Sequence, residues 1–352
     1  MDDDLQLNVP LLRRRVPNLT SAARAAGLRA ATVSNLCTGK IPVGRAEVRT
    51  LAALASLAGC SLDELIIRGG HVRMIETGIK ALDLLAPVVR GGTVGLVARA
   101  NMGQLVLLSE LMLRMKKRGY AAVFWHPGAD APGIGDVQAE AEFTHSTKDE
   151  IYERIVSLRE EKDVLLGLDR SKVLSGELFA LRESLQEAGA RPVTIALVDI
   201  QYELADDQGA YGPLDTLWRF DSDLISRSIY PAIDPVASTS TVLEGSHLDA
   251  VHLTTQQRAR KLLRRYRELR PLVAARGMER IPEPDLQFYK RGERLEAYLA
   301  QPFYVAEPFT KKPGEWLTLY ETLDDVKRIL DGETDEIEPS ELMFRGRLEV
   351  RS

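Results

Sequence analysis

Cysteine is scarce in this sequence: only Cys37 and Cys60 occur among 352 residues. Both fall inside apolar patterns with helical spacing, so we expect two packed thiols and no disulfide between them. Histidine is scarce too, and its five positions show no metal-binding spacing such as H-x-x-x-H. These absences argue against a disulfide-stapled scaffold and give no sign of a zinc centre. The five histidines are His71, His126, His145, His247 and His252.

Long hydrophobic runs are also missing. No stretch of eighteen apolar residues occurs, whereas a transmembrane helix needs about twenty. The first residues, Met1 to Asp4, are acidic and lack the apolar core of a signal peptide. We therefore expect a cytoplasmic protein that does not contact a membrane. The length allows two or three domains.

Charge is spread unevenly along the chain. The net charge is −5, but residues 1–70 carry +3 and residues 71–352 carry −8. Residues 5–70 hold nine Arg and Lys against three Asp and Glu. A basic N-terminal module on an acidic body indicates that only the small module meets a polyanion.

The basic module begins with the pattern of a helix, a tight turn and a second helix, within residues 19–38. Ala23 is small where two helices must cross closely, and Gly27 follows four residues later, where the turn needs a left-handed residue. Val33 and Leu36 have helical spacing, so we expect both to pack inward.

The rest of the module continues in helices. Residues 45–57 have an amphipathic pattern, and Ser61 is placed as the N-cap of a further helix. Together with the A-x-x-x-G, V-S-x-L and closing G-x-S-L-D-E-L patterns, this series resembles the helix-turn-helix domain of the Cro and λ-repressor type over about residues 8–68. The resemblance implies an all-α DNA-binding domain with residues 30–37 as the recognition helix.

The same resemblance implies which residues meet DNA. Asn35 would read adenine, and Arg29 would read guanine or hold a phosphate. Basic residues nearby, with Arg45 and Arg49 as further candidates, would set affinity rather than sequence choice. The alternative is a helical protein-interaction module with a solvated basic face. The expected DNA-contacting residues are Arg13, Arg14, Arg15, Arg29, Ala31, Thr32, Ser34, Asn35, Thr38 and Lys40.

The body of the chain alternates strand and helix patterns, and its last hundred residues switch to helices. Such alternation predicts an α/β fold with a parallel sheet that helices cover on both faces. The predicted strands are residues 93–97, 121–125, 164–168 and 193–198. The predicted helices are residues 105–118, 148–160, 177–188, 254–276, 285–299 and 324–331.

The segment after the first strand is laid out like a phosphate-binding loop without the residues that hold phosphate. Residues 98–105 read ARANMGQL, whereas a working loop reads G-x-x-x-x-G-K-[ST]. Only Gly103 fits. Gln104 brings no charge to the lysine position, and Leu105 has no oxygen to offer Mg²⁺. The pattern predicts a nucleotide-binding scaffold that has lost its phosphate chemistry.

Four segments around this loop closely resemble the β subunit of the rotary (F-type) ATP synthase, in the family's order, over about residues 72–350. The resemblance implies a RecA-like P-loop NTPase core, a helical C-terminal domain and a six-membered ring. The family's N-terminal β-barrel has no counterpart here. The four segments are ETGIKALDLLAP at 76–87, IYPAIDP with STS at 229–240, GME at 277–279 and QPFYVAEPFT at 301–310.

The resemblance also implies a degenerate nucleotide site. The family's catalytic glutamate falls near Ala129, so it is absent, while Asp169 matches the metal-side carboxylate. Three aromatic residues match the family's adenine pocket, so ATP or ADP could bind without hydrolysis. The alternative is that these aromatic residues belong only to the hydrophobic core between two domains. Arg99 would offer the loop its only charge. We expect no firmly held cofactor and no resident metal. The candidate nucleotide residues are Arg99, Asn101, Gly103, Gln104, Asp169, Tyr230, Phe303 and Phe309.

These observations predict three domains, at residues 1–68, 69–250 and 251–352. The hypothesis that they favour is a DNA-binding transcriptional regulator whose catalytically inactive body serves oligomerisation or nucleotide sensing. Its expected partners are double-stranded DNA and further copies of the chain, in a ring of six if the family's ring survives. The alternatives are an active ATPase that uses DNA and a non-catalytic scaffold subunit of an ATPase assembly.

Overall fold

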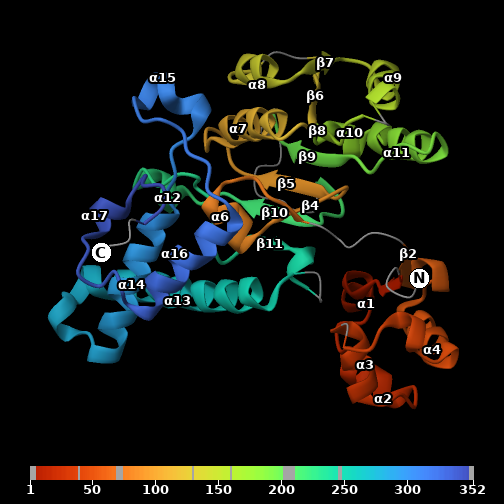
Figure 1. The fold of residues 1–352 in the computed structure, drawn as a ribbon, viewed down its shortest axis with the longest axis horizontal. Coiled ribbons are helices and arrows are strands. Elements are labelled where there is room, and N and C mark those ends of the chain that lie inside the picture. Colours follow the sequence, from red (N-terminus) through yellow and green to blue (C-terminus); the bar gives the residue numbers. More distant parts are fainter. Residues whose placement is uncertain are drawn as a thin grey trace. The chain divides into compact units, whose positions relative to one another are not determined.

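The computed structural model describes residues 5–38, 40–68, 74–128, 131–158, 161–200, 211–244 and 248–348. The chain divides into two units, shown in Figure 1. The N-terminal unit consists of residues 1–73 with 241–250, and the body consists of residues 74–240 with 251–352. The finer division into three domains stays a prediction. Among the described residues, none of the helices is long and apolar enough to span a membrane.

In its described residues, the N-terminal unit contains five α-helices and one small strand pair. The expectation of an all-α module is wrong in this one respect, because β1 (Leu5–Leu7) pairs antiparallel with β2 (Ile66–Arg68). Strands of three residues are too short for the alternation of apolar and polar residues to reveal them. The helices are α1 (Val9–Arg15), α2 (Leu19–Ala25), α3 (Ala30–Cys37), α4 (Val48–Ala58) and α5 (Leu62–Leu65).

The core of this unit follows the predicted pattern. Ala23 is fully buried between helices, and Val33 and Leu36 face inward from α3. Gly27 has φ +75°, so it provides the left-handed turn between α2 and α3. Ser61 caps α5 in a capping box with Glu64. Cys37 and Cys60 are free thiols.

A seven-stranded sheet, in the order β11-β10-β5-β9-β8-β6-β7, forms the centre of the body. All neighbouring pairs are parallel except β10–β11, which is antiparallel. A separate hairpin pairs β3 (Met74–Ile75) with β4 (Val88–Val89). The strands of the large sheet are β5 (Thr93–Val97), β6 (Ala121–Trp125), β7 (Phe143–His145), β8 (Val164–Asp169), β9 (Thr194–Val198), β10 (Thr216–Arg219) and β11 (Thr239–Ser240).

Both faces of the sheet are covered. On β6, Ala122 and Phe124 join one apolar core, while Ala121, Val123 and Trp125 join the other. This division follows the period of two along a strand and confirms the predicted α/β layering. The first core contains residues of α7 (Gln104–Lys117) and α8 (Ile134–Glu140), and the second contains residues of α9 (Lys148–Leu158) and α11 (Glu177–Glu187) (Figure 1).

The C-terminal part of the chain is helical, as predicted. Its helices enclose a third core that includes Leu263, Leu295 and Ile329 and also takes in Leu84 of α6 (Lys80–Leu85). The principal helices are α13 (Ala250–Arg276), α14 (Glu283–Leu299), α16 (Leu319–Asp331) and α17 (Pro339–Leu342). Shorter helices are α10 (Ser171–Leu174), α12 (Ser222–Ser226) and α15 (Glu307–Thr310).

Candidate functional site: a closed phosphate loop

The degenerate loop occupies the place at which parallel sheets bind ligands. β5 lies inside the sheet, between β10 and β9, and its carboxyl end leads through residues 98–103 into α7. Gly103 precedes the helix with φ +87°, and Asn101 has φ +62°, which is uncommon for a residue with a side chain. The backbone therefore turns sharply here, as the sequence predicts.

The side chains close this loop on itself. Gln104 is 1% exposed, and its Nε2 donates to the carbonyl oxygen of Arg99 at 3.4 Å. The Arg99 N–H in turn donates to Sδ of Met102 at 3.2 Å. Leu105 is 5% exposed and belongs to the apolar core. The two positions that should carry a cation and a hydroxyl are thus turned inward, and neither offers a group to a phosphate.

The carboxylate expected to face a metal is already used. Oδ1 of Asp169 accepts the N–H of Ser171 at 2.8 Å, and Oδ2 accepts the N–H of Ile200 at 2.7 Å. Asp169 is 3% exposed. Both oxygens serve the turns that follow β8 and β9, so the residues present do not fit a Mg²⁺ site. Within the described ranges, no group of three His, Cys, Asp or Glu residues is arranged to hold a metal ion.

The carboxyl ends of β8 and β9 carry a buried ion pair beside Asp169. Nε of Arg170 lies 3.2 Å from Oδ2 of Asp199, and both side chains are 2% exposed. The Tyr211 hydroxyl donates to the carbonyl oxygen of Leu96 at 3.2 Å, which joins this cluster to β5. Burial, reinforced by the charge of Asp199, raises the pKa of Tyr211, so the phenol stays protonated. Protein side chains therefore fill the edge of the sheet next to the loop.

The position predicted for the lost glutamate, Ala129, lies outside the described residues. Just before it, Nδ1 of His126 accepts the N–H of Gly128 at 3.1 Å, and the imidazole meets the ring of Phe124 edge-on. His126 thus supports a turn.

The three expected adenine-pocket aromatics have different surroundings. Phe303 is 7% exposed and belongs to the core, so its faces are not free to stack on a base. Phe309, on α15, is 86% exposed. Tyr230 is exposed, and its carbonyl oxygen accepts the N–H of Gln301 at 2.8 Å. Phe303 therefore has the environment of a hydrophobic core residue, which is the alternative to an adenine pocket.

A buried brace on α7 escaped prediction. Nε of Arg114 donates to Oε1 of Glu110 at 2.6 Å, and both side chains are 0% exposed. The guanidinium also donates to the carbonyl oxygens of Gly78 and Glu315, at 2.8 Å each. The Glu110 carboxylate accepts the N–H groups of Tyr304 and Val305 at 3.1 and 3.0 Å. The signal in the sequence was an acid and an arginine four residues apart on an otherwise apolar helix.

A second buried cation lies on α6. Nζ of Lys80 donates to the carbonyl oxygens of Tyr298 and Arg345, the latter at 2.7 Å, and stands 4.0 Å above the Tyr298 ring. Burial lowers the pKa of Lys80 to about 7, against the opposing charges of Glu315 and Asp325. Lys80 therefore fastens the helix to the C-terminal part of the chain.

In the N-terminal unit, the predicted DNA contacts fall into two groups. On and next to α3, Arg29, Ala31, Ser34 and Thr38 are exposed, and Thr32 and Asn35 are half-buried. Arg13 and Lys40 are exposed as well. Arg15, in contrast, donates to the carbonyl oxygens of Ala58 and Gly59 at the end of α4. The side chain of Arg14 lies outside the described part of the chain.

Two comparisons with known proteins identify what this fold is similar to. Residues 244–338 match the family model described as the C-terminal domain of V and A type ATP synthase. Over these residues the chain is similar to subunits of ATP synthases. Its fold is also similar to a solved structure, that of a unique ATP synthase subunit, NeqB, from Nanoarcheaum equitans. That match has a TM-score of 0.57 and 17% identity, and it covers 74% of this chain and 76% of that one.

These findings bear on the body of the chain. They agree with the parallel sheet and the C-terminal helices described above. Neither finding is specific to the F-type β subunit, and neither supports DNA binding or a role in transcription.

Proposed function

We propose that this chain is a non-catalytic subunit of an ATPase assembly. The observation that carries the proposal is the inward packing of Gln104 and Leu105, at the positions where an ATP-hydrolysing loop needs a lysine and a hydroxyl. Catalysis of phosphoryl transfer consists almost entirely of positioning and charge stabilisation. A loop without its cation, next to a carboxylate that backbone N–H groups already occupy, provides neither.

The role in an assembly is supported by the comparisons. The matched family model belongs to ATP synthases, and the similar solved structure is described as a unique ATP synthase subunit. We therefore take the body as a RecA-like P-loop NTPase fold that contributes surfaces to a ring. The segments that resemble the F-type β subunit make a six-membered ring the expected form, built from copies of this chain or shared with subunits that keep a complete phosphate loop. Binding of ATP or ADP without hydrolysis stays a prediction from the sequence.

The catalytic half of the proposal is tested with the purified full-length chain. We expect no steady-state ATP hydrolysis, and an affinity for the fluorescent analogue mant-ATP that Mg²⁺ does not raise. Asp169→Asn is the matched control, because Asp169 is the residue that the sequence predicts to face a metal ion. Turnover by the wild-type chain that Asp169→Asn abolishes would refute the proposal and favour an active ATPase.

The proposed role in an assembly is tested by measuring the mass of the particles that the chain forms in solution. Two samples are examined by light scattering and native mass spectrometry. One is the chain alone, and the other is the chain mixed with an ATP synthase subunit that has an intact G-x-x-x-x-G-K-[ST] loop. We expect the chain alone, or the mixture, to form a closed oligomer. A chain that stays monomeric under both conditions would contradict a role as an assembly subunit.

DNA binding is a second candidate function, which a feature of the N-terminal unit favours. α2, the turn at Gly27 and α3 have the order of a helix-turn-helix domain. A cavity of about 650 Å³ beside α3 is lined by Arg29, Thr32 and Arg45, among others. Arginine side chains around a concave surface fit a polyanion such as a phosphate backbone.

The test for this second function is a salt-titrated binding assay on genomic DNA fragments. If the unit reads DNA, Asn35→Ala should relax sequence preference by ~1–3 kcal/mol at one base pair. Arg29→Glu should weaken binding to every sequence. An affinity that is independent of salt, or unchanged in both variants, would leave the N-terminal unit as a protein-interaction module.

A further inference from the structure

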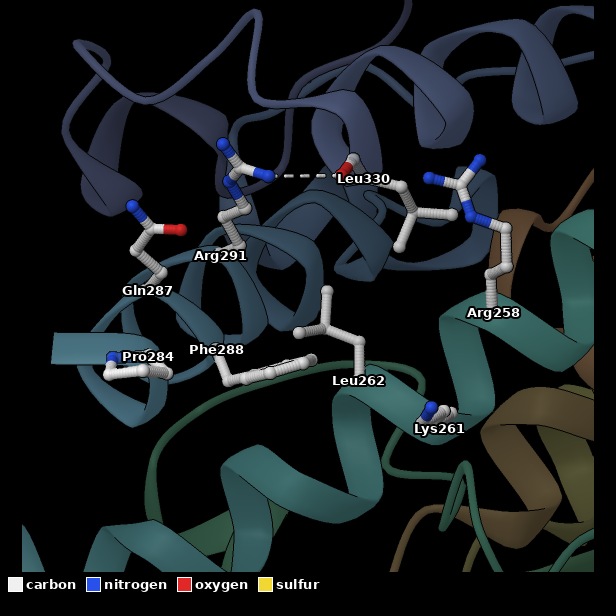
Figure 2. Close-up of a pocket in the computed structure, with 8 residues that line it drawn as sticks. All are labelled: Arg258, Lys261, Leu262, Pro284, Gln287, Phe288, Arg291 and Leu330. Carbon is white, nitrogen blue, oxygen red and sulfur yellow. Dashed lines mark hydrogen bonds between the residues drawn. The ribbon is translucent and has the colours of Figure 1, made fainter. Parts of the chain in front are cut away.

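A groove on the C-terminal helices is lined by apolar and basic residues that have no part in the proposed function. It has a volume of about 320 Å³ and lies between α13, α14 and the end of α16. Figure 2 shows Leu262 and Phe288 between two polar sides, with Arg291 and Gln287 on one and Arg258 and Lys261 on the other. Leucine, phenylalanine and proline line its floor, and three cations stand at its rim.

The cation at Lys261 is unused. Within the described residues, the ammonium group of Lys261 makes no ion pair or hydrogen bond, and the residue is exposed. The helix α13 carries eight Arg and Lys against one acidic residue. Other cations of the helix are paired, such as Arg265 with Asp285 and Arg270 with Asp223. Lys261 thus offers three N–H donors at the rim of the groove.

The two arginines of the rim are held in place and keep donors to spare. Arg258 donates to Asp331 at 2.6 Å through one nitrogen only, so four of its five N–H groups remain. Arg291 is fixed by Asp335, at 2.7 Å, and by the carbonyl oxygen of Leu330. These carboxylates hold the guanidinium groups in position before any ligand arrives, which lowers the cost of binding.

The backbone makes room for this arrangement at Gly332. A Cβ atom at this position would lie 2.1 Å from a guanidinium nitrogen of Arg291. Gly332 also has φ +93°, a backbone conformation that favours glycine. The tight end of α16 therefore lets Arg291 reach the rim of the groove.

We propose that this groove binds an organic anion in which an acidic group is attached to an apolar ring or chain. The apolar part would lie on Leu262 and on Phe288, a residue that is 40% exposed, and the acidic group would take the N–H donors of Lys261 and Arg258. A volume of about 320 Å³ is at the lower end of the range for small-molecule sites, and apolar walls with a few placed polar groups are typical of them. This inference is independent of the ATPase assembly and of DNA binding.

The test uses two probes with nearly the same rings. The first, 8-anilinonaphthalene-1-sulfonate, carries a negative charge, and N-phenyl-1-naphthylamine is its neutral counterpart. Fluorescence titration of the full-length chain should show saturable binding of the sulfonate that weakens with added salt, and much weaker binding of the neutral probe.

Variants locate the site. Lys261→Glu should weaken sulfonate binding by about tenfold or more, because it replaces attraction with repulsion at the rim. Phe288→Ala should also weaken it by removing part of the floor. Arg276→Glu is the matched control: it lies on the same helix, exposed, about 22 Å away, and should leave binding unchanged. Equal affinity of Lys261→Glu and wild type, or equal affinity for the two probes, would overturn the proposal.

Discussion

Replacing Arg114 with methionine tests whether the brace on α7 acts as a coupled pair. The change removes a guanidinium that is 0% exposed and leaves the Glu110 carboxylate buried without its counter-charge. We expect the free energy of unfolding to fall by ~3–5 kcal/mol, the range found when one partner of a buried ion pair is removed. Glu110→Leu leaves the opposite charge unpaired, so we expect a loss of similar size.

The double variant should lose much less than the sum. The two carbonyl groups that bind Arg114 most closely also accept from Nε2 of Gln301, at 2.8 and 2.7 Å, so they keep a donor. Only the N–H groups of Tyr304 and Val305 are left without their acceptor, at ~1–3 kcal/mol each. The expected total of ~2–6 kcal/mol, against ~6–10 for independent losses, implies a coupling energy of ~4 kcal/mol between the midpoints of the two ranges.

Urea unfolding followed by tryptophan fluorescence measures these losses. The three tryptophans, Trp125, Trp218 and Trp316, all lie in the body, so the signal reports on the unit that contains the brace. Glu140→Gln is the control, because it breaks a partly exposed pair with Lys116 of the same helix and should cost less than ~1 kcal/mol. Single losses that add to within ~0.5 kcal/mol in the double variant would show that the two side chains act independently.

Three further predictions follow from the contacts described. Between pH 7 and 10.5 the folded chain has lost the Lys80 proton while the unfolded chain keeps it, so unfolding takes up a proton and the free energy of unfolding rises with pH, by up to ~1.4 kcal/mol per unit. Lys80→Met should flatten this rise in urea titrations, and an unchanged slope would place the pKa of Lys80 near its usual value. Arg15→Ala should speed amide hydrogen exchange at the end of α4, by ~1 kcal/mol of local stability, whereas Arg29→Ala should leave exchange there unchanged; equal effects would contradict the cap. Thr318→Ala removes the capping box of α16 and should cost ~1 kcal/mol in thermal unfolding, so an unaltered melting temperature would count against that cap.

The sheet was predictable where its strands are apolar runs with clear ends. β5 and β6 were predicted to the residue, because glycine or the end of an apolar run marks each boundary. β7 was missed, since its three residues are only half-buried and form no apolar run. α8 was missed because it begins within a stretch rich in proline and glycine, a composition typical of loops.

The candidate site was predictable only in part. The absence of a lysine and a hydroxyl could be read directly from Gln104 and Leu105. The hydrogen bonds of Asp169 could not be predicted, because its partners are backbone N–H groups of segments that the fold brings together. The same holds for the aromatics: Phe303 and Phe309 belong to one short motif, yet one is core and the other is 86% exposed. Burial of that kind depends on tertiary packing, which local patterns do not encode.

The shortness of the two outermost strands has a consequence for how copies of the body can associate. β11 consists of two residues and β7 of three, and they are the margins of a seven-stranded sheet. Margins this short offer a neighbouring chain few open backbone groups for strand addition, which is a common safeguard against runaway fibre growth. Any association between bodies must therefore be built from side-chain surfaces, whose sequence can be tuned to choose one partner over another.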